Sequence, residues 1–523
     1  MVATGVPEDV AREYRAAGLW TGDHHWRMFT RTVRRYGDSR AVTDRYRSLT
    51  WVELAETAAQ ASAHLAALGV RRGDGVIVQM PNSVAFLETL LGIWRLGAIP
   101  VMTLPAHGST EIAYFADTAP ARHYVGPAKG DRHHARVIRD LEQGHPEVTR
   151  IAVDTRSADS PWGTHPIPEP VDVSPDELAF LQLSGGTTGT PKMIPKTHDD
   201  YLYSVRASLD VCDLGEGDTL LTVLPAAHNF SMSSPGILGA MMVGAHIVFA
   251  ADPSPTTVLP LIEKHRVTHG ALVPPMLLSY LNSSERPRHD LSSLRTLWVG
   301  GAKLSAAAAR RVKPELGCQL QQVFGMAEGL VNYTRLDDAE EIVVTTQGRP
   351  ASPWDEVRLI DAEGRDVPAG EPGELITRGP YTIRRYHRNP EANARSFTPE
   401  GFYRTGDIAT RDAQGNITVV GRAKDQINRG GEKVAPEAVE NALLGHPDVH
   451  DVSVVGIEDE VLGEKILAYV IPQEGRELSS LGLRKFARES GLSSFAVPDV
   501  VEIVAEFPYT GVGKVSKKQQ RQR

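Results

Sequence analysis

Cysteine, long apolar runs and an excess of positive charge are all scarce in this sequence of 523 residues. The two cysteines, Cys212 and Cys318, are too few for a disulfide framework or a multi-thiolate zinc site. Such a low count is typical of proteins in the reducing cytoplasm. The net charge of −9 argues against a general nucleic-acid-binding surface. A small anionic ligand stays possible, because its site needs only a few local cations.

We expect no segment of the sequence to cross a membrane or to direct secretion. The N-terminus carries Glu8 and Asp9 and lacks the apolar run of a signal peptide. Residues 237–251 are apolar, but they are too few to span a bilayer and they include His246. We interpret them as a buried helix followed by a strand. The sequence thus predicts a cytoplasmic protein without a membrane partner.

The chain is too long for one ordinary hydrophobic core and indicates about two to four domains. Short strands are predicted at residues 75–80, 246–250 and 296–300, and helical patterns at residues 51–68 and 85–96. Alternation of strands and helices predicts an α/β fold with largely parallel sheets. A smaller segment with a different pattern follows the strand-like residues 417–420, so we place a domain boundary there.

The most informative ten residues are 183–192, with the sequence LSGGTTGTPK. The glycines allow successive N–H groups to converge on an anion, the hydroxyls add donors, and Lys192 adds a positive charge. The segment follows an apolar stretch that reads as the end of a buried strand, so it predicts a loop that holds nucleotide phosphates. It is not a Walker loop, because Pro191 precedes the lysine and no Ser or Thr follows it. A flexible linker is the alternative interpretation.

Four further segments place polar groups beside turns. They are VFGMAE at 323–328, YRTGD at 403–407, GRAKDQINRGGEK at 421–433 and PYTGVGK at 508–514. Each alone has an ordinary explanation as a turn, a helix cap or a solvated tail. Together with the glycine-rich loop, and in this order, they closely resemble the adenylate-forming superfamily of acyl- and aryl-CoA synthetases, luciferases and peptide-synthetase adenylation domains. The resemblance covers nearly the full chain.

Other segments look like the free-standing aryl-acid AMP ligases of siderophore and aryl-capped natural-product pathways. They are KTHDDY at 196–201, PAAHNF at 225–230, SSPG at 233–236 and EGLVNY at 328–333. The resemblance implies that ATP activates an aryl carboxylic acid to aryl-AMP, and that the acyl group then passes to the phosphopantetheine thiol of an aryl carrier protein supplied in trans. A ligase that uses free coenzyme A is one alternative, and a non-catalytic nucleotide-binding protein is another.

The same resemblance implies a large N-terminal domain of stacked mixed sheets with flanking helices over residues 1–421. Residues 426–523 would form a small, mobile α+β C-terminal domain. Residues 422–425 would be the hinge, with Lys424 at the hinge position, although an ordinary exposed lysine is the alternative. Lys514 would be the catalytic lysine that bridges the attacking carboxylate and the α-phosphate, because a compact ammonium on a long stem can reach a transient site.

For ATP, the resemblance implies that the glycine-rich loop holds the β- and γ-phosphates. Asp407 would accept hydrogen bonds from both ribose hydroxyls, and Glu328 would bind Mg²⁺ as a hard oxygen ligand. Phe324 would stack on adenine, although a core aromatic is the alternative. The implied ATP-binding residues are Ser184, Gly185, Gly186, Thr187, Thr188, Gly189, Lys192, Gly301, Ala302, Phe324, Asp407 and Arg422.

For the aryl acid, Asn229 would hydrogen-bond the hydroxyl ortho to the carboxylate, because an amide can both donate and accept. His228 would be a gate near the carboxylate and not a base, since a carboxylic acid is already ionised at pH 7. Ser234 favours 2,3-dihydroxybenzoate. Phe230 departs from the tyrosine of dihydroxybenzoate ligases and leaves salicylate, 3-hydroxyanthranilate and 3-hydroxypicolinate open. The residues implied for the ring are Asn229, Phe230, Ser234, Val323 and Val331.

Overall fold

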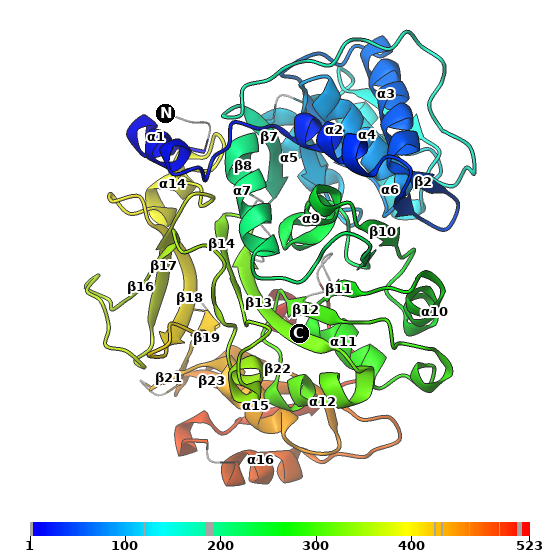
Figure 1. Cartoon of the computed structure of the whole chain (residues 1–523). Coiled ribbons are helices and arrows are strands. Elements are labelled where there is room, and N and C mark those ends of the chain that lie inside the picture. Colours follow the sequence, from blue (N-terminus) through cyan, green and yellow to red (C-terminus); the bar gives the residue numbers. More distant parts are fainter. Residues whose placement is uncertain are drawn as a thin grey trace.

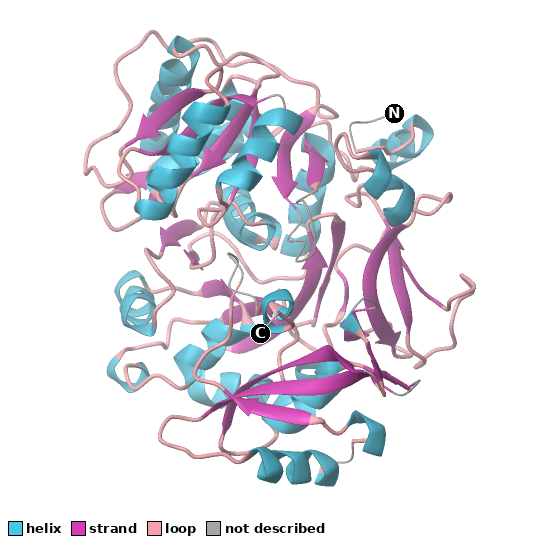
Figure 2. Cartoon of the chain, turned by 180° about the vertical axis from the view of Figure 1, so that it is seen from behind, coloured by secondary structure: helices cyan, strands magenta, loops and turns pink. Residues whose placement is uncertain are grey.

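The computed structural model describes residues 4–119, 121–183, 192–422, 425–429, 432–459, 461–490, 492–509 and 515–522. Within these ranges the strands form four sheets, with helices packed around them (Figures 1 and 2). The mixed α/β architecture predicted from the sequence is confirmed. Residues 184–191 of the glycine-rich loop, Lys424 and Lys514 lie outside the described residues.

The first sheet contains the strand predicted near residue 75. Its strands are β3 (Gly75–Gln79), β4 (Ile99–Thr103), β5 (Ala121–Pro127), β6 (Thr149–Val153), β7 (Leu178–Leu183) and β8 (Met193–Thr197). They lie in the order β6-β5-β3-β4-β7-β8, and every adjacent pair is parallel except β7–β8. Every residue of β3 is buried, as is typical of parallel sheets covered by helices on both faces. The glycine-rich loop therefore connects two strands at one edge of this sheet.

The second sheet contains the strands predicted near residues 246 and 296. Its strands are β1 (Arg40–Thr43), β2 (Ser48–Thr50), β9 (Thr219–Thr222), β10 (His246–Phe249), β11 (His269–Leu272), β12 (Thr296–Gly300), β13 (Gln319–Met326), β14 (Gly329–Tyr333) and β15 (Arg349–Pro350). Their order is β15-β14-β13-β12-β11-β9-β10-β1-β2. The strands from β13 to β1 run parallel, whereas β2, β14 and β15 pair antiparallel.

Helices fill the connections of these two sheets. They are α1 (Glu8–Ala16), α2 (His25–Tyr36), α3 (Trp51–Ala67), α4 (Val84–Arg95), α5 (Ser109–Thr118), α6 (Arg132–Gly144), α7 (His198–Leu209), α8 (Asn229–Ser233), α9 (Gly236–Val243), α10 (Pro255–His265), α11 (Pro274–Leu281), α12 (Ala306–Leu316) and α13 (Glu340–Thr345). The predicted helices near residues 51 and 85 are α3 and α4, and residues 237–251 contain α9 and β10, as expected. Of the described helices, none has the length and apolar character needed to span a bilayer.

The third and fourth sheets follow in sequence. The third is antiparallel and consists of β16 (Glu356–Ile360), β17 (Gly373–Arg378), β18 (Tyr403–Arg411) and β19 (Ile417–Arg422), with α14 (Pro390–Ser396) beside it. The fourth consists of β20 (Ile427–Arg429), β21 (Glu432–Val434), β22 (Val449–Asp459), β23 (Gly463–Pro472) and β24 (Val500–Ile503), with helices α15 (Pro436–Leu444), α16 (Ser480–Glu489) and α17 (Lys517–Gln520). A hydrophobic cluster drawn from residues 427–501 alone packs within this last unit, which lies at the bottom of Figure 1.

Candidate active site

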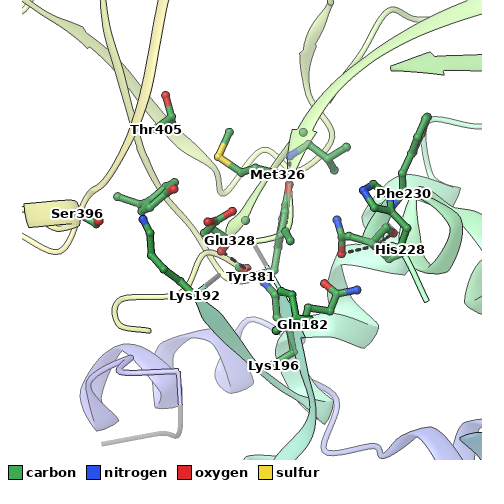
Figure 3. Close-up of a pocket in the computed structure, with 18 of the residues that line it drawn as sticks. Gln182, Lys192, Lys196, His228, Phe230, Met326, Glu328, Tyr381, Ser396 and Thr405 are labelled. Atoms are coloured by element: carbon green, nitrogen blue, oxygen red, sulfur yellow. Dashed lines mark hydrogen bonds between the residues drawn. The ribbon is translucent and has the colours of Figure 1, made fainter. Parts of the chain in front are cut away.

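A cavity of about 790 Å³ lies where the first three sheets meet. Residues from β7, α7 and α8 line one part of it, and residues from α14 and β18 line another. Figure 3 shows His228 and Phe230 at one side, Lys192 and Ser396 at the opposite side, and Glu328 between them. The lining residues extend in sequence from Met102 to Arg422, so the fold joins segments that are far apart along the chain.

The short helix α8 presents the residues predicted to bind an aryl ring. His228 is its N-cap, and its Nδ1 accepts a hydrogen bond of 3.2 Å from the backbone N–H of Phe230. Asn229, Phe230 and Ser234 all line the cavity, together with Val323 of β13 and Val331 of β14. These predicted residues therefore lie together, with apolar side chains on two sides of a polar amide.

A hydrogen-bond chain lies behind Asn229. The Tyr201 hydroxyl donates to Asn229 Oδ1 at 2.9 Å, and the Gln182 Nε2 amide lies 3.4 Å from the same hydroxyl. The Ser233 hydroxyl also lies 3.5 Å from Asn229 Oδ1. Gln182 and Tyr201 line the cavity as well. Sequence reasoning did not single out either residue, although Tyr201 ends the KTHDDY motif.

Asp407 and Arg422 face each other across β18 and β19, where they are register partners. The Arg422 Nε donates to Asp407 Oδ1 at 2.8 Å, and the backbone N–H of Asp407 donates to the Thr405 hydroxyl at 3.0 Å. Asp407 is buried, whereas Arg422 is exposed. The antiparallel pairing therefore fixes a carboxylate at the cavity wall, with the guanidinium of Arg422 beside it.

Glu328 lies just after β13, in the turn to β14, and it is buried at the cavity wall. The Tyr386 hydroxyl donates to Glu328 Oε1 at 2.9 Å and lies 3.1 Å from the Tyr403 hydroxyl. Lys192 Nζ lies 3.4 Å from the Tyr386 hydroxyl and 4.6 Å from the centroid of its ring. A lysine that follows the glycine-rich loop thus lies close to the glutamate that sequence reasoning assigned to the metal.

Among the described residues, no three His, Cys, Asp or Glu side chains gather into a metal-binding cluster. Glu328 therefore contributes a single carboxylate, one oxygen of which already accepts from Tyr386. Mg²⁺ in proteins is typically held by one or two carboxylates together with substrate phosphates and water. The donor set around Glu328 fits such a shared ion, and it does not fit a cage built by protein ligands alone.

A buried lysine, Lys196, lines the cavity together with Glu328 and was not predicted as a site residue. Its Nζ donates to the backbone oxygen of Tyr381 at 2.8 Å and to that of Glu328 at 3.4 Å. Burial lowers the pKa of Lys196, and the neighbouring carboxylate of Asp200 opposes this shift. Burial raises the pKa of Asp200 to about 7, although Lys196 acts in the opposite direction. Lysine is normally an exposed residue, so the residue type alone could not predict that Lys196 is buried at the site.

Two of the residues predicted to contact adenine, Phe324 and Ala302, are not among the residues that line the cavity. Phe324 packs against the hydrophobic cluster that contains Leu330 and Ile417. Its strand neighbours Val323 and Gly325 line the cavity, as expected when successive side chains point to opposite faces of a strand. Gly301 lines the cavity, whereas Ala302 beside it is exposed and is not among the lining residues. The adenine contacts of Phe324 and Ala302 stay predictions.

Comparison with known proteins gives matches along almost the whole chain. The family described as AMP-binding enzyme matches residues 29–387, and the family described as AMP-binding enzyme C-terminal domain matches residues 438–514. A 2,3-dihydroxybenzoate-AMP ligase of Bacillus subtilis is 48% identical over 521 residues, which cover 99% of this chain and 96% of that protein. A salicyl-AMP ligase / salicyl-S-ArCP synthetase of Mycobacterium tuberculosis is 41% identical over 526 residues, with 98% and 93% covered. The apo structure of MbtA from Mycobacterium smegmatis is 42% identical with a TM-score of 0.76, and the match covers 99% of this chain and 98% of that one.

Proposed function

Because this chain belongs to the AMP-binding enzyme family, as its motifs predicted, we propose that it uses ATP to convert an aryl carboxylic acid to aryl-AMP and pyrophosphate. One observation carries the proposal: the residues assigned to the ring line the same cavity as Lys192, Gly301, Asp407 and Arg422, which are assigned to the nucleotide. Two of the similar proteins are named for such acids, 2,3-dihydroxybenzoate and salicylate. Both acids place a hydroxyl next to the carboxylate.

The aryl acid is proposed to bind between Phe230, Val323 and Val331, which supply a flat apolar slot. Asn229 then faces the substituent ortho to the carboxylate. Ser234 lines the same part of the cavity and offers a partner for a hydroxyl at the 3-position. 2,3-Dihydroxybenzoate would use both polar side chains, and salicylate would use only the amide. His228 is proposed to act as a gate near the carboxylate.

The nucleotide is proposed to occupy the opposite part of the cavity. Asp407 would accept hydrogen bonds from the ribose hydroxyls, and Arg422, which donates to that carboxylate, would assist at the ribose. Lys192, with the glycine-rich loop before it, would bind the β- and γ-phosphates. Lys514 would bridge the carboxylate and the α-phosphate. The attack brings two anions together, so these cations offset their repulsion and stabilise the charge that develops on phosphorus.

We propose Mg²⁺ as the metal, held by Glu328 together with phosphate oxygens of ATP. A bound Mg²⁺ supplies charge neutralisation at the phosphates and orients the departing pyrophosphate. The chain's own contribution is to hold the Glu328 carboxylate in place through the Tyr386 hydroxyl, and to hold the backbone of the same residue through Lys196.

The second half-reaction is proposed to transfer the aryl group from AMP to the phosphopantetheine thiol of an aryl carrier protein. Residues 1–421 would be the adenylation domain and residues 426–523 the lid that carries Lys514, with residues 422–425 as the hinge. The separate sheet and separate hydrophobic cluster of the C-terminal unit support this division. Lys424 is proposed as the hinge residue.

The test is pyrophosphate exchange into ATP with a panel of acids: salicylate, 2,3-dihydroxybenzoate, 3-hydroxyanthranilate and 3-hydroxypicolinate. We expect exchange that depends on the acid, strongest with one of the first two. Absence of exchange with every acid would overturn the proposal and favour a non-catalytic nucleotide-binding protein. A second assay compares coenzyme A with phosphopantetheinylated carrier protein as the acceptor of preformed aryl-AMP. Faster transfer to coenzyme A would replace the carrier protein with the free thiol.

A further inference from the structure

We propose that Tyr201 is a positioning residue that makes the aryl-acid site selective for an ortho substituent that accepts a hydrogen bond. The inference rests on the proposed function, because it concerns how the aryl acid is chosen. Tyr201 would act through Asn229 by fixing which end of the side-chain amide faces the ring. The site would therefore favour an ortho-hydroxy acid over the matching ortho-amino acid.

The side-chain oxygen of Asn229, Oδ1, accepts a short hydrogen bond within the protein. The Tyr201 hydroxyl donates to this oxygen at 2.9 Å, whereas the Ser233 hydroxyl lies 3.5 Å from it and 3.3 Å from the backbone oxygen of Asn229. Tyr201 is therefore the donor that holds Oδ1, and it turns this oxygen toward α7. Within the described part of the chain, the Nδ2 group of Asn229 donates to no protein acceptor. The amide therefore presents its N–H donors to the cavity that it lines.

The direction of the Tyr201 hydroxyl is set by its other neighbour. Gln182 Nε2 donates to the Tyr201 oxygen at 3.4 Å, which leaves the tyrosine proton to point at Asn229. Burial raises the pKa of Tyr201, so the hydroxyl keeps its proton throughout the neutral range. The ring is held edge-on to Phe180, with centroids 4.5 Å apart, and it is stacked on His25 at 6.2 Å. The donor is thus fixed in position by the hydrophobic core.

The chemistry of the two acids differs at the group that Asn229 would meet. In salicylate the ortho hydroxyl donates its proton to the adjacent carboxylate, and its oxygen is left to accept from Nδ2. In anthranilate one amino N–H takes that internal bond, and the second N–H points outward at the same place. The amino lone pair is delocalised into the ring and accepts poorly. Two donors then face each other, and neither finds an acceptor. An unpaired donor of this kind lowers kcat/KM for anthranilate relative to salicylate by about tenfold to a hundredfold.

The test compares kcat/KM for salicylate and anthranilate in acid-dependent pyrophosphate exchange. Wild type is expected to prefer salicylate by at least about tenfold. Tyr201→Phe removes the donor to Asn229 Oδ1, so the amide can turn its oxygen toward the outward N–H of anthranilate. We expect the salicylate/anthranilate ratio to fall by about tenfold or more, chiefly through a gain for anthranilate. A merely structural loss would lower both acids together and leave the ratio unchanged, and that result would overturn the inference.

Tyr203→Phe is the matched control, since the same hydroxyl is removed two residues along α7. The Tyr203 hydroxyl bonds Ser352 at 2.7 Å and does not line the cavity, so the ratio should stay at the wild-type value. If Tyr201→Phe does not fold, the salicylate/anthranilate ratio of Asn229→Asp provides the second test. Tyr201 would then bind one carboxylate oxygen, and the other would face the ring as an acceptor. The ratio is expected to fall again, and an unchanged ratio would overturn the inference.

The two levels of proposal fail in different ways. If wild type exchanges pyrophosphate with no aryl acid, the proposed function is wrong and the inference falls with it. If wild type is active with salicylate but does not prefer it to anthranilate, only the inference is wrong. An equal drop of the ratio in the Tyr203→Phe control would likewise overturn it, because the effect would not come from the contact with Asn229.

Discussion

Lys196→Met should destabilise the protein and slow adenylation, because Lys196 is buried at the cavity wall. Its ammonium donates to two backbone oxygens, those of Tyr381 and Glu328, and lies near the carboxylate of Asp200. Methionine has a similar length but no donor. The substitution therefore leaves both oxygens, which belong to buried residues, without this donor, and it also removes the positive charge near Asp200.

The size of the effect follows from these contacts. Leaving two buried backbone oxygens without a donor costs about 1–3 kcal/mol each, and the substitution also removes the positive charge near Asp200. The carboxyl of Asp200 can take up a proton, since its pKa is already raised to about 7, so we expect the lower end of that range. A folding unit of about 400 residues has an unfolding entropy of roughly 0.9 kcal/mol/K, so about 3 kcal/mol corresponds to about 3 °C.

The assay combines melting temperature with pyrophosphate exchange at pH 7. Lys196→Met should lower the melting temperature by about 3 °C and lower kcat, because Glu328 loses its backbone anchor. Adding Asp200→Asn should cost little more, since asparagine keeps the oxygen that accepts from the Thr197 N–H at 2.9 Å and carries no charge. Lys129→Met replaces an exposed lysine and serves as the control. A fall below 1 °C, or additive losses in the double variant, would refute the reasoning.

Three further predictions concern the nucleotide, Lys514 and acid stability. Asp407→Asn should raise KM for ATP by roughly tenfold or more, because a charged acceptor for ribose and Arg422 is lost; an unchanged KM in the exchange assay would contradict this. Lys514→Ala should abolish adenylate formation but largely spare thiolation of preformed adenylate, and equal loss of both would speak against its assigned role. Burial lowers the pKa of His198 to about 3, below the value near 6.5 of the unfolded chain. As the pH falls from 6.5 toward 3, the unfolded chain therefore takes up a proton that the folded protein does not, and the free energy of unfolding decreases. His198→Asn should therefore shift acid unfolding, followed by circular dichroism, to lower pH, whereas an unchanged midpoint would exclude His198 as the cause.

Elements with strong local signals could be predicted from the sequence. The apolar run of β12 is followed by glycines, and α3 is rich in alanine and free of proline, so both were located to within a residue or two. The antiparallel sheet from β16 to β19 was not predicted as a unit. Its strands carry a mixture of buried and partly buried residues, and long connections separate β16 from β17 and β17 from β18.

The site was predictable where a motif carries the chemistry and not where the fold creates the contact. Glu328, Asn229 and Asp407 come from motifs and line the cavity. Tyr201 meets Asn229 only because α7 and α8 pack together, and no local pattern encodes that contact. A motif assigned Phe324 to adenine, and its ring packs against a hydrophobic cluster, so its contact with adenine stays a prediction.

The position of β1 in the second sheet leaves one of its edges unpaired while the chain is being synthesised. Its partner β2 follows almost at once, but on the other side Val42 pairs with Ile247 of β10, roughly 200 residues later. At about 5–20 residues per second, roughly 10–40 s of synthesis separate the two strands. During that interval one edge of β1 presents unpaired N–H and C=O groups, which can pair with other chains. Nascent chains shorter than about 250 residues should therefore be the most aggregation-prone and the most dependent on chaperones.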